Sequence, residues 1–136
     1  MAGRDEEGFT LLELLVVIII LGILAAIAVP VFLRQREKGW RTNAVSDMKN
    51  AATAVESYAT DHEGSYLDLN GVDQTSPLLT NEGFRKNVWV ALTVVTDPVG
   101  LTYCVRGEHQ HLPGREFVYR SGAGVVQMDA PGVLPC

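Results

Sequence analysis

Residues 8–33, GFTLLELLVVIIILGILAAIAVPVFL, contain one charged side chain, Glu13, followed by twenty positions without any charge. Twenty residues in an α-helix rise about 30 Å, which matches the hydrocarbon thickness of a bilayer. The remainder of the chain is ordinarily polar. The sequence therefore predicts an apolar helical arm followed by a soluble head.

The apolar run is better explained as a lasting anchor than as a secretory signal peptide. Ala26, Ile27 and Ala28 resemble a small-x-small cleavage site, but a signal peptide has a shorter apolar core, and the helical pattern here continues beyond the run. The flanking charges, MAGRDEEG before the run and RQREKGWR after it, favour a head inside the cell when counted alone. The two cysteines favour an oxidising exterior, so composition leaves the orientation open.

The rest of the chain suffices for one small domain that begins with a helix. The sequence has 136 residues and a formal net charge of −5, and about 100 residues lie outside the apolar run. Apolar residues recur at intervals of three and four, and Gly64 predicts the helix stop, so we expect a helix from Phe9 to about His62. The predicted core-facing residues are Trp40, Ala44, Met48, Ala51, Ala52, Val55, Tyr58, Ala59 and His62.

The last third of the chain has the composition of short strands. A loop rich in turn formers is expected over residues 65–83, and strands over residues 87–96, 101–106, 116–120 and 124–128. Short strands separated by proline and glycine turns suit an antiparallel meander on the amphipathic helix. The predicted fold class is α+β, a long N-terminal α-helix packed against a small antiparallel β-sheet.

The N-terminal segment resembles the signature of type IV pilins and related pseudopilins. The resemblance rests on Gly8 followed by Phe9, on Glu13 at the fifth position after that junction, and on an apolar run that contains Gly22 and Pro30. It implies that prepilin peptidase cuts after Gly8 on the cytoplasmic side, that the new N-terminal Phe9 is methylated, and that the head lies outside the cytoplasmic membrane. The expected domains are a leader over residues 1–8, a transmembrane and filament-core helix over 9–33, and a globular pilin head over 34–136.

Cleavage after Gly8 would place a free α-amine on Phe9, one helical turn from Glu13. A carboxylate inside a filament core of packed apolar helices has little water and is strongly disfavoured unless it is paired. We therefore expect Glu13 to pair with the Phe9 amine of a neighbouring subunit during assembly, the alternative being an interfacial acid that reaches water. Gly22 and Pro30 either bend and loosen the arm or are the glycine and proline that membrane helices tolerate.

Cys104 and Cys136 are the two cysteines of the chain. A disulfide between them would close a loop of about 32 residues and hold the C-terminal tail on the sheet. The alternative is two free thiols, with Cys104 buried as a small apolar residue.

Two groups of potential metal ligands are incomplete. Asp68, Asn70 and Asp73 have calcium-like spacing but lack the third early carboxylate and the late glutamate of a calcium loop. His109 and His111 lack a third zinc ligand. No nucleophile, base and orienting group can be assembled, so we expect no metal, no cofactor and no enzymatic activity.

The predicted function is that of a structural subunit of a type IV pilus-like filament. One alternative is a minor or competence pilin that binds DNA through Arg85, Lys86, Arg106, Arg115 and Arg120, against which the acidic balance counts. Another is a pseudopilin of a type II secretion system. The expected partners are prepilin peptidase, other copies of the chain in a helical filament, the pilus assembly platform and the cytoplasmic membrane. The chain would cross that membrane once, with its head outside, and enter an extracellular pilus after assembly.

Overall fold

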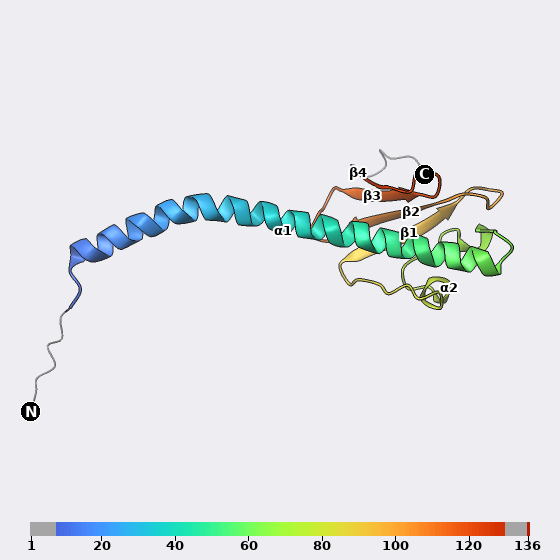
Figure 1. The fold of residues 1–136 in the computed structure, drawn as a ribbon, viewed down its shortest axis with the longest axis horizontal. Helices are drawn as coiled ribbons and strands as arrows, with labels where there is room; N and C mark the ends of the chain where they lie inside the picture. Colours follow the sequence, from blue (N-terminus) through green and yellow to red (C-terminus); the bar gives the residue numbers. More distant parts are fainter. Residues whose placement is uncertain (1–7, 130–135) are drawn as a thin grey trace, which may run out of the picture. The chain divides into compact units, whose positions relative to one another are not determined.

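The computed structural model describes residues 8–129 and residue 136. The chain divides into two compact units, Met1–Arg36 and Glu37–Cys136. The elements, shown in Figure 1, are α1 (Leu11–Asp61), η1 (Leu67–Leu69), α2 (Pro77–Thr80), β1 (Val90–Thr96), β2 (Tyr103–His109), β3 (Glu116–Arg120) and β4 (Val126–Asp129). The strands form one antiparallel sheet in the order β1-β2-β3-β4. The α+β prediction is confirmed.

The described part of the first unit, residues 8–36, consists of the junction before α1 and the apolar part of this helix. The helix is unbroken through Gly22 and Pro30, so any bending by these residues does not interrupt it. The helix begins at Leu11, two residues later than predicted. Residues 1–7 of the predicted leader lie outside the described residues.

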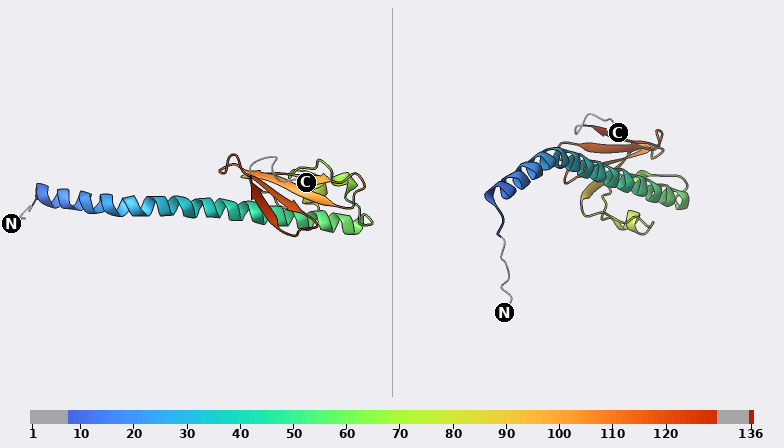
Figure 2. Two further views of the ribbon diagram at one scale, coloured as in Figure 1. Left: turned by 90° about the horizontal axis from the view of Figure 1, so that it is seen from above. Right: turned by 60° about the vertical axis from the view of Figure 1, so that its left-hand side comes forward.

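In the second unit, the part of α1 that belongs to the head packs on one face of the sheet, and the strands run obliquely to the helix (Figure 2). The predicted helix face is confirmed at Ala44, Met48, Ala51, Ala52, Val55, Tyr58 and Ala59, which are buried. Trp40 is only half-buried and His62 is exposed. His62 instead stacks on Tyr58, with ring centroids 3.7 Å apart. The helix ends where the backbone turns left-handed at Glu63 and Gly64, and the Gly64 N–H closes the end on the Ala59 carbonyl at 2.8 Å.

The inward faces of β1, β2 and β3 contribute to the core, β3 through Phe117. β1 contributes Val90, Leu92 and Val94, and β2 contributes Tyr103 and Val105. β2 runs on to His109, three residues beyond the prediction, because His109 lies opposite Val90 in the register of the two strands. β1 begins at Val90 rather than residue 87, since the Asn87 side chain bends the chain by accepting the Trp89 N–H at 3.0 Å. β4 begins at Val126 rather than residue 124, after the left-handed Gly124.

The predicted loop over residues 65–83 contains the short helices η1 and α2, and part of it covers the outer edge of β1. Val94 exchanges backbone hydrogen bonds with this loop: its N–H donates to the Val72 carbonyl and its carbonyl accepts the Gly71 N–H, both at 2.8 Å. The Gln74 side chain accepts the Leu92 N–H at 2.9 Å. The edge is thereby closed against pairing with another chain.

Candidate assembly site

The junction predicted for cleavage lies just outside the helix. Gly8 and Phe9 precede the first turn of α1, and 85% of the Phe9 side chain is exposed. Their backbone is therefore free of the helical hydrogen-bond ladder. No contact in the described residues hides the junction from an enzyme that must bind the chain around it.

Thr10 and Glu13 form a capping box at the start of α1. The Glu13 Oε2 atom accepts hydrogen bonds from the Thr10 N–H and the Thr10 hydroxyl, both at 3.0 Å, and the Glu13 N–H donates to Thr10 Oγ1 at 3.2 Å. This reciprocal arrangement satisfies backbone donors that a helix start leaves open. It explains why α1 begins at Leu11. The sequence carries the signal for this cap as the spacing Thr-x-x-Glu, from Thr10 to Glu13.

The capping box leaves one oxygen of the carboxylate without a described partner. Both bonds from Thr10 end on Oε2, and no described group bonds Oε1 of Glu13. An external ammonium group can thus approach Oε1 while the helix cap stays intact.

The arm beyond Glu13 presents apolar side chains on every side. Its large apolar residues are exposed, and α1 is long and apolar enough to cross a membrane, the one helix of this kind in the described residues. Exposed apolar surface of this extent requires a lipid or protein environment. Together with the signature at its start, the arm indicates membrane anchoring. The exposed residues are Leu14, Leu15, Val16, Val17, Ile18, Ile19, Ile20, Leu21, Ile23, Leu24, Ile27, Val29, Val31, Phe32 and Leu33.

The Glu56 carboxylate of α1 forms hydrogen bonds with two tyrosines of the head. The Glu56 side chain accepts the hydroxyl protons of Tyr103 and Tyr66, each at 2.9 Å. Burial of Tyr103 and its hydrogen bond to Glu56 raise the pKa of this phenol, so the hydroxyl remains a donor at physiological pH. Glu56 is not among the predicted core-facing residues, and it is exposed.

His109 and His111 join an aromatic cluster. The His111 ring stacks on Trp40, with centroids 4.9 Å apart, and lies 4.8 Å from the Trp89 ring. His109 is buried, and its Nδ1 accepts the His111 N–H at 3.1 Å. Burial, with a smaller contribution from His111, lowers the pKa of His109. In this structure the two histidines therefore serve packing.

Asp47 is buried although it is not among the predicted core-facing residues of the helix. Only 8% of the residue is exposed, and its Oδ2 has no hydrogen-bond partner in the described residues. Burial raises the pKa of this carboxyl group. Burial therefore disfavours the ionised Asp47 carboxylate in the folded state.

The other polar groups that the sequence singled out take part in turns. The Asp68 carboxylate accepts the Tyr58 hydroxyl at 3.3 Å, and the Asn70 side chain accepts the Thr96 N–H at 3.2 Å. Asp73 accepts both the N–H and the hydroxyl of Thr75, which lowers its pKa. No group of three potential metal ligands occurs in the described residues.

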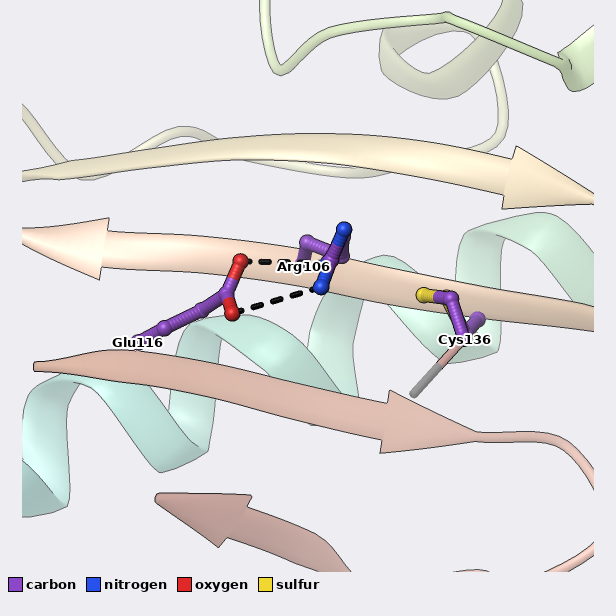
Figure 3. Close-up of polar contacts among 4 residues, drawn as sticks. Arg106, Glu116 and Cys136 are labelled. Carbon is purple, nitrogen blue, oxygen red and sulfur yellow. Dashed lines mark hydrogen bonds and ion pairs between the residues drawn. A yellow bond between two sulfur atoms is a disulfide. The ribbon is translucent and has the colours of Figure 1, made fainter. Parts of the chain in front are cut away.

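The outer face of the sheet carries an ion pair and the disulfide (Figure 3). Arg106 on β2 contacts Glu116 on β3, with Nε 3.1 Å from Oε1. Of the five basic residues considered for DNA, Arg106 is therefore already paired. Cys104 is bonded to Cys136, with the Cα atoms 5.7 Å apart, so Cys136 is attached to β2, one of the two inner strands of the sheet.

The described features define a class of protein: a pilin-like subunit, with an apolar arm that begins at a capped glutamate and a head built on the same helix. A family model for the prokaryotic N-terminal methylation motif matches residues 3–29. The type II secretion system core protein G of Vibrio cholerae serotype O1 is 44% identical over 122 residues, which cover 87% of this chain and 73% of that protein. The chain belongs to the family of the type II secretion system core protein G.

Other relatives support the assignment over different lengths. The core protein G of Escherichia coli (strain K12) is 31% identical over 119 residues, 81% of this chain and 78% of that protein. That of Pectobacterium carotovorum is 44% identical over 61 residues, 45% of this chain, and the match spans only 39% of that protein. The chain likewise spans about half, 51%, of the relative from Aeromonas hydrophila. No solved structure matches.

Proposed function

We propose that the chain is a structural, non-enzymatic subunit of a pilus-like filament of a type II secretion system. The observation that carries the proposal is the exposed apolar arm with the Thr10–Glu13 cap at its start. The similarity to core protein G, which extends through the head, favours a secretion filament over a surface pilus. In this proposal the filament is built in the cell envelope, from subunits stored in the cytoplasmic membrane with the head on the outer side.

Processing precedes assembly in this proposal. Prepilin peptidase removes residues 1–8, and the new amine of Phe9 is methylated, which keeps its positive charge. The exposure of Gly8 and Phe9 outside the helix supports this step, and the methylation motif covers the junction. Residues 9–33 then act as the membrane helix and later as part of the filament core.

Docking is proposed to bring the Phe9 amine of one subunit to Glu13 of another. The free Oε1 of Glu13 accepts the ammonium group, while Oε2 keeps the helix cap of Thr10. Burial of the carboxylate among apolar arms makes this pairing strongly favourable relative to an unpaired charge.

The test separates processing, insertion and assembly. Gly8→Leu should block cleavage, as read by the intact mass of the protein. Glu13→Ala and Glu13→Gln should still be cleaved and should float with membranes, but should reduce the ratio of sheared filament to membrane pool at equal expression. Thr10→Ala is the matched control because it weakens the cap and keeps the carboxylate; it should assemble better than either Glu13 variant. Normal assembly of both Glu13 variants would refute the docking role.

The secretion assignment has its own test. Deletion of the gene should stop the export of secreted enzymes, and restoring the chain should recover it. Long surface filaments built mostly of this chain at its natural level, with secretion intact after deletion, would overturn the assignment in favour of a surface pilus.

A further inference from the structure

Exposed apolar side chains gather at the end of the head where α1 terminates. Leu67 on η1, and Val99 and Leu101 in the turn between β1 and β2, are exposed to 49%, 67% and 71%. Gly100 of this turn packs on Leu67, since a Cβ at Gly100 would lie 2.5 Å from the Leu67 side chain, and the Gly100 carbonyl accepts the Tyr66 N–H at 3.0 Å. Figures 1 and 2 show the end of α1 and this turn at the same end of the head. The three apolar side chains therefore belong to one surface.

Acidic side chains adjoin this apolar surface. The Asp97 carboxylate accepts the Thr102 N–H at 2.7 Å, which holds it in the same turn as the apolar residues. Arg120 is the one cation among the described residues that line the hollow beside Asp97. The other acids lie at the end of α1 and on η1, and we call the whole surface the distal patch: Asp61, Glu63, Leu67, Asp68, Asp97, Val99 and Leu101.

The distal patch is acidic even when Arg120 is counted with it. Four carboxylates face one guanidinium group, with histidine counted as neutral. The remaining cations of the second unit lie elsewhere: on earlier turns of α1, before β1, within β2 or in the turn after β2. They are Lys38, Arg41, Lys49, Arg85, Lys86, Arg106 and Arg115. An apolar surface with an acidic border is complementary to a partner with exposed apolar side chains and an excess of cations.

One segment of this chain has that chemistry. We call residues 34–41, RQREKGWR, the basic run; it has four cations, Arg34, Arg36, Lys38 and Arg41, and one acid, Glu37. Arg41 pairs with Glu37 within the run, so the remaining cations give it a positive excess. Phe32 and Leu33, just before the run, are exposed. The basic run thus offers cations next to exposed apolar side chains.

The distal patch cannot reach the basic run of its own chain. α1 is unbroken between Arg41 and Asp61, and these 20 residues correspond to about 30 Å along the helix. A contact between the two surfaces must therefore join two copies. Because the surfaces differ, each copy can bind one neighbour through its distal patch and another through its basic run. Such a contact repeats without pairing the copies off as dimers, as a filament requires.

We propose that the distal patch of one subunit binds the basic run of another copy in the filament. The apolar side chains of the distal patch lose their exposure in this contact, and its carboxylates meet the arginine and lysine side chains of the neighbour. The contact orients the heads in one direction, because it joins unlike ends. The proposal rests on the filament in the proposed function, and it adds a contact that is separate from the pairing at Glu13.

The test is cross-linking between two singly substituted chains that are co-expressed in cells assembling the filament. Val99→Cys marks the distal patch, and Gly39→Cys marks the basic run, where an added Cβ meets no atom within 4 Å. A short bismaleimide joins the two new thiols and leaves the disulfide between Cys104 and Cys136 intact. Val88→Cys is the matched control for Val99→Cys, since it is also an exposed valine and lies before the opposite end of β1.

We expect cross-linked pairs of copies in sheared filaments from positions 99 and 39, and few from positions 88 and 39. Lys38→Glu in the Gly39→Cys chain should lower the cross-linked fraction about threefold, and Asp61→Lys in the Val99→Cys chain should restore it. Lys49→Glu makes the same change of charge at another exposed lysine of α1 and should leave the fraction unchanged.

Several results would overturn the contact while leaving the filament in place. These are filaments without a cross-link between positions 99 and 39, equal cross-linking from position 88, and cross-linking of position 99 to a different protein. An equal loss with Lys49→Glu, or no recovery with Asp61→Lys, would also overturn it, because net charge would then explain the effect of Lys38→Glu. Absence of filaments from the unsubstituted chain would contradict the proposed function itself.

Discussion

Removal of the disulfide is expected to destabilise the head strongly. The bond between Cys104 and Cys136 closes a loop with a sequence separation of 32 residues. Loop-entropy reasoning gives such a closure about 3.7 kcal/mol at 25 °C. The second unit, Glu37–Cys136, has the size of a small domain, for which each kcal/mol moves the thermal midpoint by about 4–8 °C. Cys136→Ser should therefore lower the midpoint by roughly 15–30 °C.

The assay is thermal unfolding of the processed chain in detergent, followed by circular dichroism in the near ultraviolet. Cys136→Ser is preferred to a change at Cys104, because Cys136 is exposed whereas Cys104 is buried and its replacement would also disturb packing. The wild-type protein treated with a reductant should show the same loss as the variant. The variant should also be cut faster by proteases near residues 131–135, while cleavage after Gly8 is unchanged.

Two results would refute this reasoning. If both thiols are alkylated in the native, unreduced protein, the bond does not form. If the bond is present but reduction leaves the midpoint unchanged, the loop contributes no stability and the tail is held by other contacts.

Three further predictions concern buried polar groups of the head. The pKa of His109 is lowered in the folded state, so the unfolded chain takes up a proton at higher pH than the folded chain does, and stability should fall as pH drops below about 6.5. The unfolding free energy of wild type should therefore exceed that of His109→Gln by less at pH 5.5 than at pH 7.5. A difference that stays constant over this pH range would contradict the prediction. The raised pKa of Asp47 means that the folded state favours its neutral form, so Asp47→Asn should raise the thermal midpoint at pH 7 by about 2–5 °C. This gain should fade as pH approaches 4, because the wild-type carboxylate then takes up a proton. A thermal midpoint at pH 7 equal to or lower than that of wild type would count against the prediction. Tyr103→Phe removes the hydroxyl that donates to Glu56 and should lower the free energy of unfolding in urea by about 1–2 kcal/mol. Tyr66→Phe should lower it less, because Tyr66 is less buried than Tyr103. The reverse order would contradict the stabilising role assigned to the Tyr103–Glu56 hydrogen bond.

Local patterns in the sequence sufficed for the arm and the helix. The absence of charge over residues 14–33 predicted an arm that a small head cannot bury, and the spacing of Ala44, Met48, Ala51 and Val55 predicted the face that packs on the sheet. The Thr10–Glu13 cap was equally local, since both partners lie within one turn, and the Thr-x-x-Glu spacing alone could have revealed it.

Tertiary structure decided which polar groups are buried and where the strands end. Asp47 follows the polar pattern of the helix and is nevertheless buried, and Glu56 becomes a structural acceptor only because Tyr103, 47 residues away, is brought to it. β2 extends to His109 because its register with β1 places Val90 opposite. Periodicity, caps and uncharged runs depend on neighbours within a few residues, whereas burial and pairing depend on partners that only the folded chain brings together.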